Sequence, residues 1–210
     1  MNIKKTIFIH IPRTGGCFAN SYLKNNIFKE LLVFDSWKEN KNRDWNGKEL
    51  LNFMDYEKCY IHNHTWEKDV FLKFKEKKWF SFFFIRNPKD IICSRYFRDK
   101  ENGLYSDLSL EDFLNSKENL ESLFPSFWKE VSYIDEFSEK NFSIFIKKVF
   151  KKKYISHKAI NCSGNKGYDF YFKEEKKIKK KTDQLIESSY FFQQYLEIKS
   201  YIKKNKNKLN

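Results

Sequence analysis

The sequence has no C-x-x-C pair. Its four cysteines are Cys17, Cys59, Cys93 and Cys162, and their spacing argues against a zinc ribbon or a thioredoxin-like redox motif. Cys59 and Cys93 have apolar neighbours in the sequence, which favours buried free thiols. A chain of 210 residues can bury roughly 70% of its unfolded surface, so it needs no disulfide or metal ion to hold its core together.

Long apolar runs are also missing. The run Trp79–Ile85 is far too short to span a bilayer, and the run Thr6–Ile11 is too short for the apolar region of a signal peptide. We therefore expect a cytoplasmic protein without a transmembrane segment. No internal repeat or linker interrupts the sequence, so we expect a single domain over residues 1–210, with a frayed tail at 205–210.

What is present is an aromatic and strongly basic composition. Hydrophobic residues make up 40% of the chain and aromatic residues 19%, which indicates a globular protein. A net charge of +13 suits an anionic ligand such as a nucleic acid, a membrane surface, a nucleotide or an acidic glycan. Alternatively, many of the lysines are simply solvated surface. No nucleic-acid-binding module is recognisable, so we expect no nucleic-acid partner.

Apolar runs and helix-capping residues predict strands that alternate with helices. Strands are expected at residues 3–11, 59–64, 79–85 and 131–137. Helices are expected at residues 17–26, 66–78, 88–100, 110–116, 138–151 and 182–202, with short helical stretches at 50–54 and 125–129. Thr65 is the expected cap of the second helix, and residues 152–181 are expected to be irregular. This alternation predicts the α/β class, with a P-loop-like parallel sheet flanked by helices.

The first motif lies where the first expected strand meets the first expected helix. Two glycines there permit tight turns, so that backbone N–H groups and a helix N-terminus point at one spot and form an anion site. Arg13 adds a positive charge and Thr14 a hydroxyl donor. The motif lacks the first Gly and the Gly-Lys-Ser/Thr ending of a P-loop that binds ATP with magnesium. An ordinary strand-to-helix turn is the alternative. The candidate binding residues are Pro12, Arg13, Thr14, Gly15, Gly16, Cys17 and Phe18.

A second junction follows the apolar run at 79–85. Arg86 stands at the junction, Pro88 lies in the first turn of the expected helix, and Ser94 follows about two helical turns after Arg86. Arg86 and Ser94 are therefore candidates to flank a second phosphate. The alternative is that Arg86 makes a capping contact or an ion pair and that Ser94 is an ordinary helix residue.

A third motif places two histidines at the end of an expected strand. His62 and His64 alternate along the chain, so they face the same side of a sheet, and ligands of open parallel sheets gather at the carboxyl ends of strands. A metal site needs a third ligand, and the spacing indicates none. A core or surface histidine is a further alternative. A neutral imidazole is also well suited to accept a hydroxyl proton at pH 7.

Taken together, these motifs resemble those of sulfotransferases that use 3′-phosphoadenosine-5′-phosphosulfate (PAPS), in the branch that modifies carbohydrates. The family loop typically reads P-K-T-G-G-T, and Arg13 and Cys17 stand here at its Lys and last Thr. The segment from Arg86 to Tyr96 is similar to R-D-P-x-x-R-x-x-S-x-Y, with Asn87 at its Asp. The segment His62-Asn63-His64 resembles the H-G-H stretch of hexuronic-acid O-sulfotransferases.

The resemblance implies a role for each motif. The loop would bind the 5′-phosphosulfate, with Arg13 beside the bridging oxygen, and Arg86 and Ser94 would bind the 3′-phosphate. His64 would be the general base, with His62 as its helper. The cofactor would be PAPS, the product 3′-phosphoadenosine-5′-phosphate (PAP), and no metal would be required. A basic loop at Lys166 and Gly167 matches a late family segment more loosely, with a solvent-exposed loop as the equal alternative.

The resemblance also implies the reaction class. The chain would transfer a sulfuryl group to an acceptor hydroxyl, on a carbohydrate or polysaccharide. Residues 27–55 and 103–130 match no family motif, and we expect them to shape the acceptor pocket. Three alternatives remain at this point: a nucleotide-binding, P-loop kinase-like protein, a nucleic-acid-binding protein, and a degenerate family member that binds PAP without catalysis.

Overall fold

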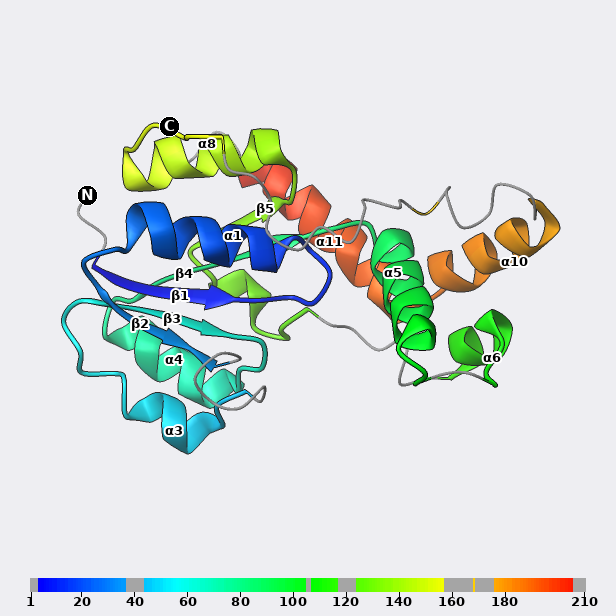
Figure 1. The fold of residues 1–210 in the computed structure, drawn as a ribbon, viewed down its shortest axis with the longest axis horizontal. Helices are drawn as coiled ribbons and strands as arrows, with labels where there is room; N and C mark the ends of the chain where they lie inside the picture. The colour runs from blue at the N-terminus through cyan, green and yellow to red at the C-terminus, as the bar shows by residue number, and fades with distance from the viewer. Residues whose placement is uncertain are drawn as a thin grey trace. The chain divides into compact units, whose positions relative to one another are not determined.

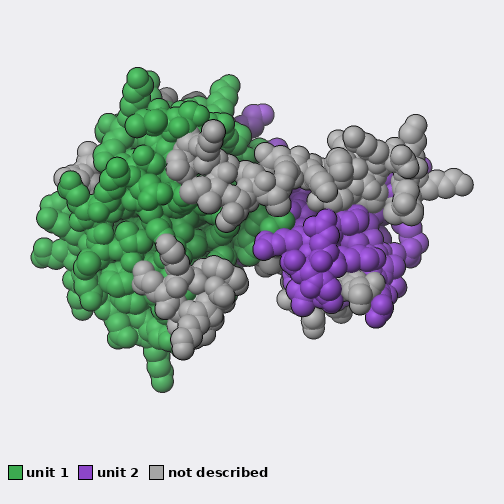
Figure 2. All heavy atoms as spheres, viewed as in Figure 1, with its two compact units in different colours: residues 1–85, 125–161, 207–210 green, residues 86–124, 162–206 purple. Residues whose placement is uncertain are grey.

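The computed structural model describes most of the chain, and its contacts divide the chain into two compact units (Figure 2). Unit 1 comprises residues 1–85, 125–161 and 207–210, and unit 2 comprises residues 86–124 and 162–206. Described within them are residues 4–36, 44–104, 107–116, 124–156, 168 and 176–205.

Unit 1 is built on a five-stranded sheet with the strand order β2-β3-β1-β4-β5. Every pair of neighbouring strands is parallel. The α/β class with a parallel sheet flanked by helices is therefore confirmed. The strands are β1 (Lys5–Ile9), β2 (Leu32–Asp35), β3 (Cys59–Asn63), β4 (Phe80–Ile85) and β5 (Tyr133–Glu136).

Helices cover both faces of this sheet. Figure 1 shows α1 and α8 on one face and α3 and α4 on the other. α1 continues without a break into η1, a π-helical turn. A further short element is the 3₁₀ turn η2. The helical elements are α1 (Gly16–Tyr22), η1 (Leu23–Ile27), α3 (Gly47–Leu51), α4 (Lys68–Glu76), η2 (Trp128–Glu130) and α8 (Glu139–Phe150).

The core beneath α1 and α8 is largely aromatic. Phe8 of β1 stacks on Phe82 of β4 with ring centroids 4.7 Å apart, and Phe145 of α8 lies 4.9 Å from Phe82. Since side chains alternate along a strand, Phe8 shares its face of the sheet with His10 and, through the β1–β3 pairing, with His62. The same packed face therefore continues into the polar residues at the carboxyl ends of the strands.

Unit 2 is helical. Tyr96 of α5 packs on Phe113 of α6 at 5.2 Å between ring centroids, and Phe124 packs on Phe191 of α11 at 5.0 Å. Lys89 of α5 pairs with Asp183 of α10 at 2.6 Å. The helices of this unit are α5 (Pro88–Glu101), α6 (Leu110–Asn115), α10 (Lys176–Glu187) and α11 (Tyr190–Asn205).

Two helix expectations were wrong. The single terminal helix expected at 182–202 is two helices, and the first already begins at Lys176, inside the segment expected to be irregular. The break falls at Ser189, whose hydroxyl donates to the carbonyl of Ile186 and accepts from the backbone N–H of Phe192. Thr65 does not cap α4; the residue at the N-cap is Glu67, and it makes no side-chain capping bond.

No helix among the described residues is long and apolar enough to cross a membrane.

Candidate functional site

The loop after β1 has the shape expected of an anion site. Arg13 and Gly15 both have positive φ angles, 67° and 79°, and α1 begins at Gly16. The first N–H groups of a helix have no partner inside the helix, which holds for those of the buried Gly16 and the exposed Cys17. Pro12 and Cys17 are exposed and Arg13 is half-buried.

Thr14 differs from its expected role. Its side chain is fully buried, and its hydroxyl donates to the backbone carbonyl of Ile11 at 2.8 Å. This hydroxyl is therefore engaged inside the loop and is not the ligand donor that we expected. It fixes the turn that leads from β1 into Arg13, which is a positioning role.

Both glycines of the loop are required by close contacts. A Cβ atom on Gly15 would lie 2.2 Å from the Phe137 ring, and a Cβ atom on Gly16 would lie 2.0 Å from Nε2 of His10. Gly15 also needs its positive φ angle, which residues with a side chain rarely adopt. The imidazole of His10 therefore packs directly against the first residue of α1.

Phe18 contributes its backbone to this loop and its side chain to the core. Its ring makes edge contacts with Phe137 and Phe142, at 6.1 and 5.5 Å between centroids. The side chain thereby anchors the first turn of α1 to α8.

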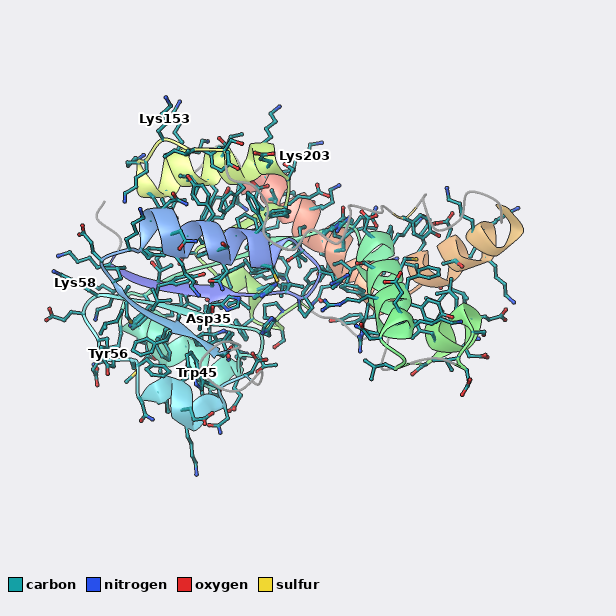
Figure 3. All side chains as sticks on the ribbon, in the orientation of Figure 1. Asp35, Trp45, Tyr56, Lys58, Lys153 and Lys203 are labelled. Atoms are coloured by element: carbon teal, nitrogen blue, oxygen red, sulfur yellow. The ribbon has the colours of Figure 1, made fainter. Side chains whose placement is uncertain are left out.

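A chain of hydrogen bonds connects the ends of three strands. Nδ1 of His62 lies 2.9 Å from Oδ1 of Asp35, and Nε2 of His62 lies 2.8 Å from Nδ1 of His10. The pairing of β2 with β3 sets Asp35 opposite His62. Figure 3 labels Asp35 at the end of β2. His10 and His62 are buried, with exposed fractions of 5% and 3%, so these contacts are shielded from solvent.

Electrostatic interactions within this series of hydrogen bonds keep the carboxylate of Asp35 ionised and the imidazoles of His62 and His10 neutral. Burial alone would raise the pKa of Asp35, but its hydrogen bonds and charge interactions with His62 and Lys24 outweigh burial and hold that pKa well below its ordinary value. Lys24 donates to Oδ2 at 2.7 Å, and Asn20 donates to the same oxygen at 3.0 Å. Burial lowers the pKa of both His62 and His10.

Neutral rings and an ionised Asp35 assign the tautomers of this chain. The carboxylate accepts the proton of His62 Nδ1, which leaves a lone pair on Nε2 of His62. That lone pair accepts the proton of His10 Nδ1, and Nε2 of His10 then carries the remaining lone pair, beside Gly16. These protons are assigned from the hydrogen-bond network.

His64 forms a second carboxylate–imidazole pair. Its Nδ1 lies 2.9 Å from Oδ1 of Asp44, and its backbone N–H donates to the same oxygen at 3.1 Å. Burial would raise the pKa of Asp44, but the hydrogen bonds from His64 hold it lower. The His64 side chain is 18% exposed, which makes it more accessible than His62. Its ring lies 4.3 Å from that of His10 between centroids.

Asn63 fixes the segment that carries Asp44. Its side-chain oxygen accepts from the backbone N–H of Trp45 at 3.1 Å, and its amide donates to the carbonyl of Trp45 at 3.1 Å. A cavity of about 310 Å³ lies beside this segment, lined in part by Asp44, Trp45, Thr65 and Trp66. The cavity therefore borders Asp44, the partner of His64.

The second predicted phosphate motif lies in unit 2. Nε of Arg86 lies 3.4 Å from Oδ2 of Asp90, one helical turn further on. Asn87 is the N-cap of α5, where its side chain accepts from the N–H of Lys89, and Pro88 is the first helical residue. Ser94 lies on the same helix and is half-buried. Lys166 and Gly167 lie outside the described residues.

The sequence did not reveal three residues of this cluster. His10 precedes the loop by two residues and was not distinguished from the strand that carries it. Asp35 and Asp44 lie in the segment 27–55, which matched no motif. Of the three, only His10 could have been found from the sequence. It lies two residues after the core residue Phe8, and residues two apart on a strand share a face of the sheet.

Comparisons with models of protein families and with curated proteins find no match for this chain.

Proposed function

We propose that this protein transfers a sulfuryl group from PAPS to an acceptor hydroxyl. One observation carries the proposal: the ring of His10 packs against Gly16 of the loop and lies 4.3 Å from the ring of His64. A strand-to-helix anion loop and an imidazole with an orienting carboxylate are therefore adjacent within unit 1. Sulfuryl transfer needs both, a cradle for a phosphosulfate and a base for the acceptor.

The loop would hold the 5′-phosphosulfate. The N–H groups at the start of α1 would donate to the phosphate oxygens, and the guanidinium of Arg13 would stabilise the bridging oxygen as negative charge develops on it. Arg86 and Ser94 would bind the 3′-phosphate, an assignment that rests on their motif.

His64 would act as the base. Asp44 would accept the proton of Nδ1, which would leave the lone pair of the ring on Nε2, the atom that would take a proton from the acceptor. The oxygen of the acceptor forms its bond to sulfur while the bond from sulfur to the bridging oxygen breaks. The proton moves to His64, and PAP leaves with the electron pair of the broken bond.

His62 would support this chemistry without taking the proton itself. Both of its ring nitrogens are engaged, by Asp35 and by His10, and the residue is 3% exposed. We therefore assign His62 a positioning role: it holds His10 against Gly16 and next to His64.

The cavity beside Asp44 would receive the acceptor. Trp45 and Trp66 line it, and aromatic faces suit sugar rings. These features support a carbohydrate as the acceptor class.

A transfer assay tests the proposal. Purified protein is incubated with ³⁵S-labelled PAPS and a panel of oligosaccharides, and labelled product and PAP are measured together. We expect Arg13→Ala to lower the rate about 100-fold or more, as loss of a donor to developing charge does, whereas Arg98→Ala, an exposed charge on α5, should leave it unchanged. Equal rates for the wild type and Arg13→Ala would refute the role of the loop.

His64→Gln tests the base separately. We expect it to lower the transfer rate by about 10²–10⁴-fold and to leave the affinity for PAP within about twofold. Full activity of His64→Gln would contradict its assignment, and a parallel loss of PAP affinity would show a structural role instead.

A further inference from the structure

We propose that His10, His62 and His64 together bind one divalent transition-metal ion of the Zn²⁺ type, and that the bound ion blocks sulfuryl transfer. The second part rests on the proposed function; the first does not. One ligand nitrogen from each of the three histidines lies within 4.8 Å of the others. The sequence indicated no third ligand for His62 and His64, and His10 supplies it from the neighbouring strand end.

Two carboxylates orient the imidazoles for such a site. Asp35 holds Nδ1 of His62, and Asp44 holds Nδ1 of His64, each at 2.9 Å. Nε2 is then the ligand atom on both rings. A carboxylate behind a histidine ligand is the usual arrangement in zinc sites, where it fixes the ring and raises the basicity of the ligand.

The nitrogen–nitrogen distances fit an ion after a small adjustment. Zn–N bonds of about 2.0–2.1 Å in a tetrahedral site set ligand nitrogens about 3.3 Å apart. Nδ1 of His10 and Nε2 of His62 are 2.8 Å apart. An ion between them displaces the proton on Nδ1 of His10 to Nε2 of the same ring, and it needs the two ligand nitrogens to separate by about 0.5 Å. One nitrogen of each ring lies within 4.8 Å of a nitrogen of the other two, so each such pair is at most about 1.5 Å wider than a tetrahedral site requires.

The surrounding backbone limits where these rings can go. The β1–β3 ladder places Phe8 opposite His62. His10 packs so closely against Gly16 that a Cβ atom added to Gly16 would clash with the His10 ring. The backbone N–H of His10 also donates to the carbonyl of Asn63 at 3.0 Å. A site preorganised in this way loses little freedom when an ion binds.

The ligand set selects the kind of ion. Three imidazoles suit Zn²⁺, Co²⁺, Ni²⁺ or Cu²⁺, whereas Mg²⁺ and Ca²⁺ prefer oxygen ligands. Three protein ligands leave a fourth position for water. An ion bound to Nε2 of His64 occupies the lone pair that would take the acceptor proton, so occupancy and transfer exclude each other.

Titration of the metal-free 210-residue chain, without a histidine tag, tests the site. Co²⁺ is added to chelator-treated protein and followed by its visible absorption, and Zn²⁺ affinity is measured by calorimetry against a competing chelator. We expect one ion per chain, with no comparable binding of Mg²⁺. His64→Ala and His10→Ala should each weaken Zn²⁺ binding at least 100-fold, and His157→Ala, at the remaining histidine, should not change it.

The orienting carboxylates supply a second, milder test. Asp44→Asn should weaken Zn²⁺ binding by about 10–100-fold while the ligands themselves remain. Circular dichroism checks that each variant folds, and His64→Gln replaces His64→Ala if the latter does not. The proposal would be overturned if Zn²⁺ affinity were unchanged in both His64 variants. It would also be overturned if the Co²⁺ spectra lacked the visible absorption of Co²⁺ bound to nitrogen ligands.

The two proposals fail separately. PAP binding to the metal-free protein, measured by calorimetry, tests the proposed function and does not involve the ion. Zn²⁺ binding without PAP binding would leave the metal site standing and refute the sulfotransferase assignment. PAP binding without Zn²⁺ binding would do the reverse. If both bind, addition of Zn²⁺ should abolish transfer and leave PAP affinity within about twofold, and undiminished transfer at saturating Zn²⁺ would refute the block.

Discussion

At the scale of single residues, the histidine cluster shows what a sequence motif leaves out. His62 and His64 were recognisable because they alternate at a strand end. Their partners Asp35 and Asp44 come from segments that share no pattern with them, and only the strand order β2-β3-β1 brings Asp35 and His10 to either side of His62. The sequence therefore predicted the imidazoles that end β3 and could not predict the carboxylates that orient them.

Gly16→Ala tests the contact between the loop and the cluster. The added Cβ atom would lie 2.0 Å from Nε2 of His10, so either His10 or α1 must move. We expect a loss of about 1–3 kcal/mol in the free energy of unfolding and a loss of PAP affinity of at least tenfold. The readouts are urea unfolding and calorimetry.

Gly103→Ala is the control for a glycine substitution without a close contact, although Gly16 itself has no positive φ angle. Gly103 has a φ angle of +80°, similar to the left-handed residues of the loop, but a Cβ atom there meets nothing within 4 Å. It should cost about 1 kcal/mol and leave PAP affinity unchanged. The importance of the contact between Gly16 and His10 would be contradicted if both variants lost PAP affinity equally, or if neither variant lost any.

Cys17 reports on the occupancy of the loop. It is exposed at the start of α1, whereas Cys59 and Cys93 are buried. Burial raises the pKa of both buried thiols to about 12, so at pH 8 only about one in ten thousand of each is the reactive thiolate. We expect iodoacetamide to label Cys17 before Cys59 and Cys93, and PAP to slow the labelling of Cys17.

Peptide mapping by mass spectrometry measures the labelling of each cysteine, and Cys59 and Cys93 serve as internal controls. Labelling of Cys17 that saturating PAP does not slow would contradict phosphate binding at the start of α1.

At the scale of elements, apolar runs predicted most of the sheet. β1, β3, β4 and β5 each fall within an expected strand, because each is a run of buried residues covered on both faces. β2 was missed because it is a short edge strand, Leu32–Asp35, in which only Asp35 is fully buried. The role of β2 is to place Asp35 within hydrogen-bond distance of His62.

The break between α10 and α11 has a local cause that the sequence concealed. Helical periodicity continues across residues 188–189, so a single helix was expected. Ser189 interrupts it by accepting from the N–H of Phe192 at 3.2 Å, as an N-cap residue does. A serine inside an apolar and basic stretch is weak evidence for a helix boundary. Only the hydrogen bonds of Ser189 in the structure identify it as a cap.

Ser189→Ala tests this cap. Loss of the hydroxyl leaves the N–H of Phe192 without its side-chain acceptor, and we expect a cost of about 1 kcal/mol in the free energy of unfolding. Ser188→Ala, at the exposed neighbour, should cost less than about 0.5 kcal/mol. Thermal and urea unfolding measure both, and an equal effect of the two substitutions would argue against the cap.

At the scale of the whole molecule, the sequence predicted the class of fold and an affinity for anions. The class is confirmed. The single domain expected over residues 1–210 stays a prediction, and the contacts divide the chain into two compact units. That division has no signature in the sequence, because unit 2 is assembled from two separate stretches, 86–124 and 162–206, with neither a linker nor a change of composition at their ends.

The net charge of +13 leads to a kinetic prediction. A strongly basic protein attracts a polyanionic nucleotide over a distance of about a Debye length, ~8–10 Å at physiological salt. We expect the association rate of PAP to fall as salt is raised, while its dissociation rate changes little. Stopped-flow binding at several salt concentrations measures both rates, and a salt effect confined to dissociation would contradict the prediction.

The central claim is that the loop at Pro12–Gly16 belongs to a site for a nucleotide with both a 5′- and a 3′-phosphate. Calorimetry of the metal-free protein with PAP, and in parallel with ATP and magnesium, tests it most directly. We expect PAP to bind with 1:1 stoichiometry and at least tenfold more tightly than ATP with magnesium. ATP that binds as tightly as PAP or more so, or no measurable heat of binding with PAP, would contradict the claim.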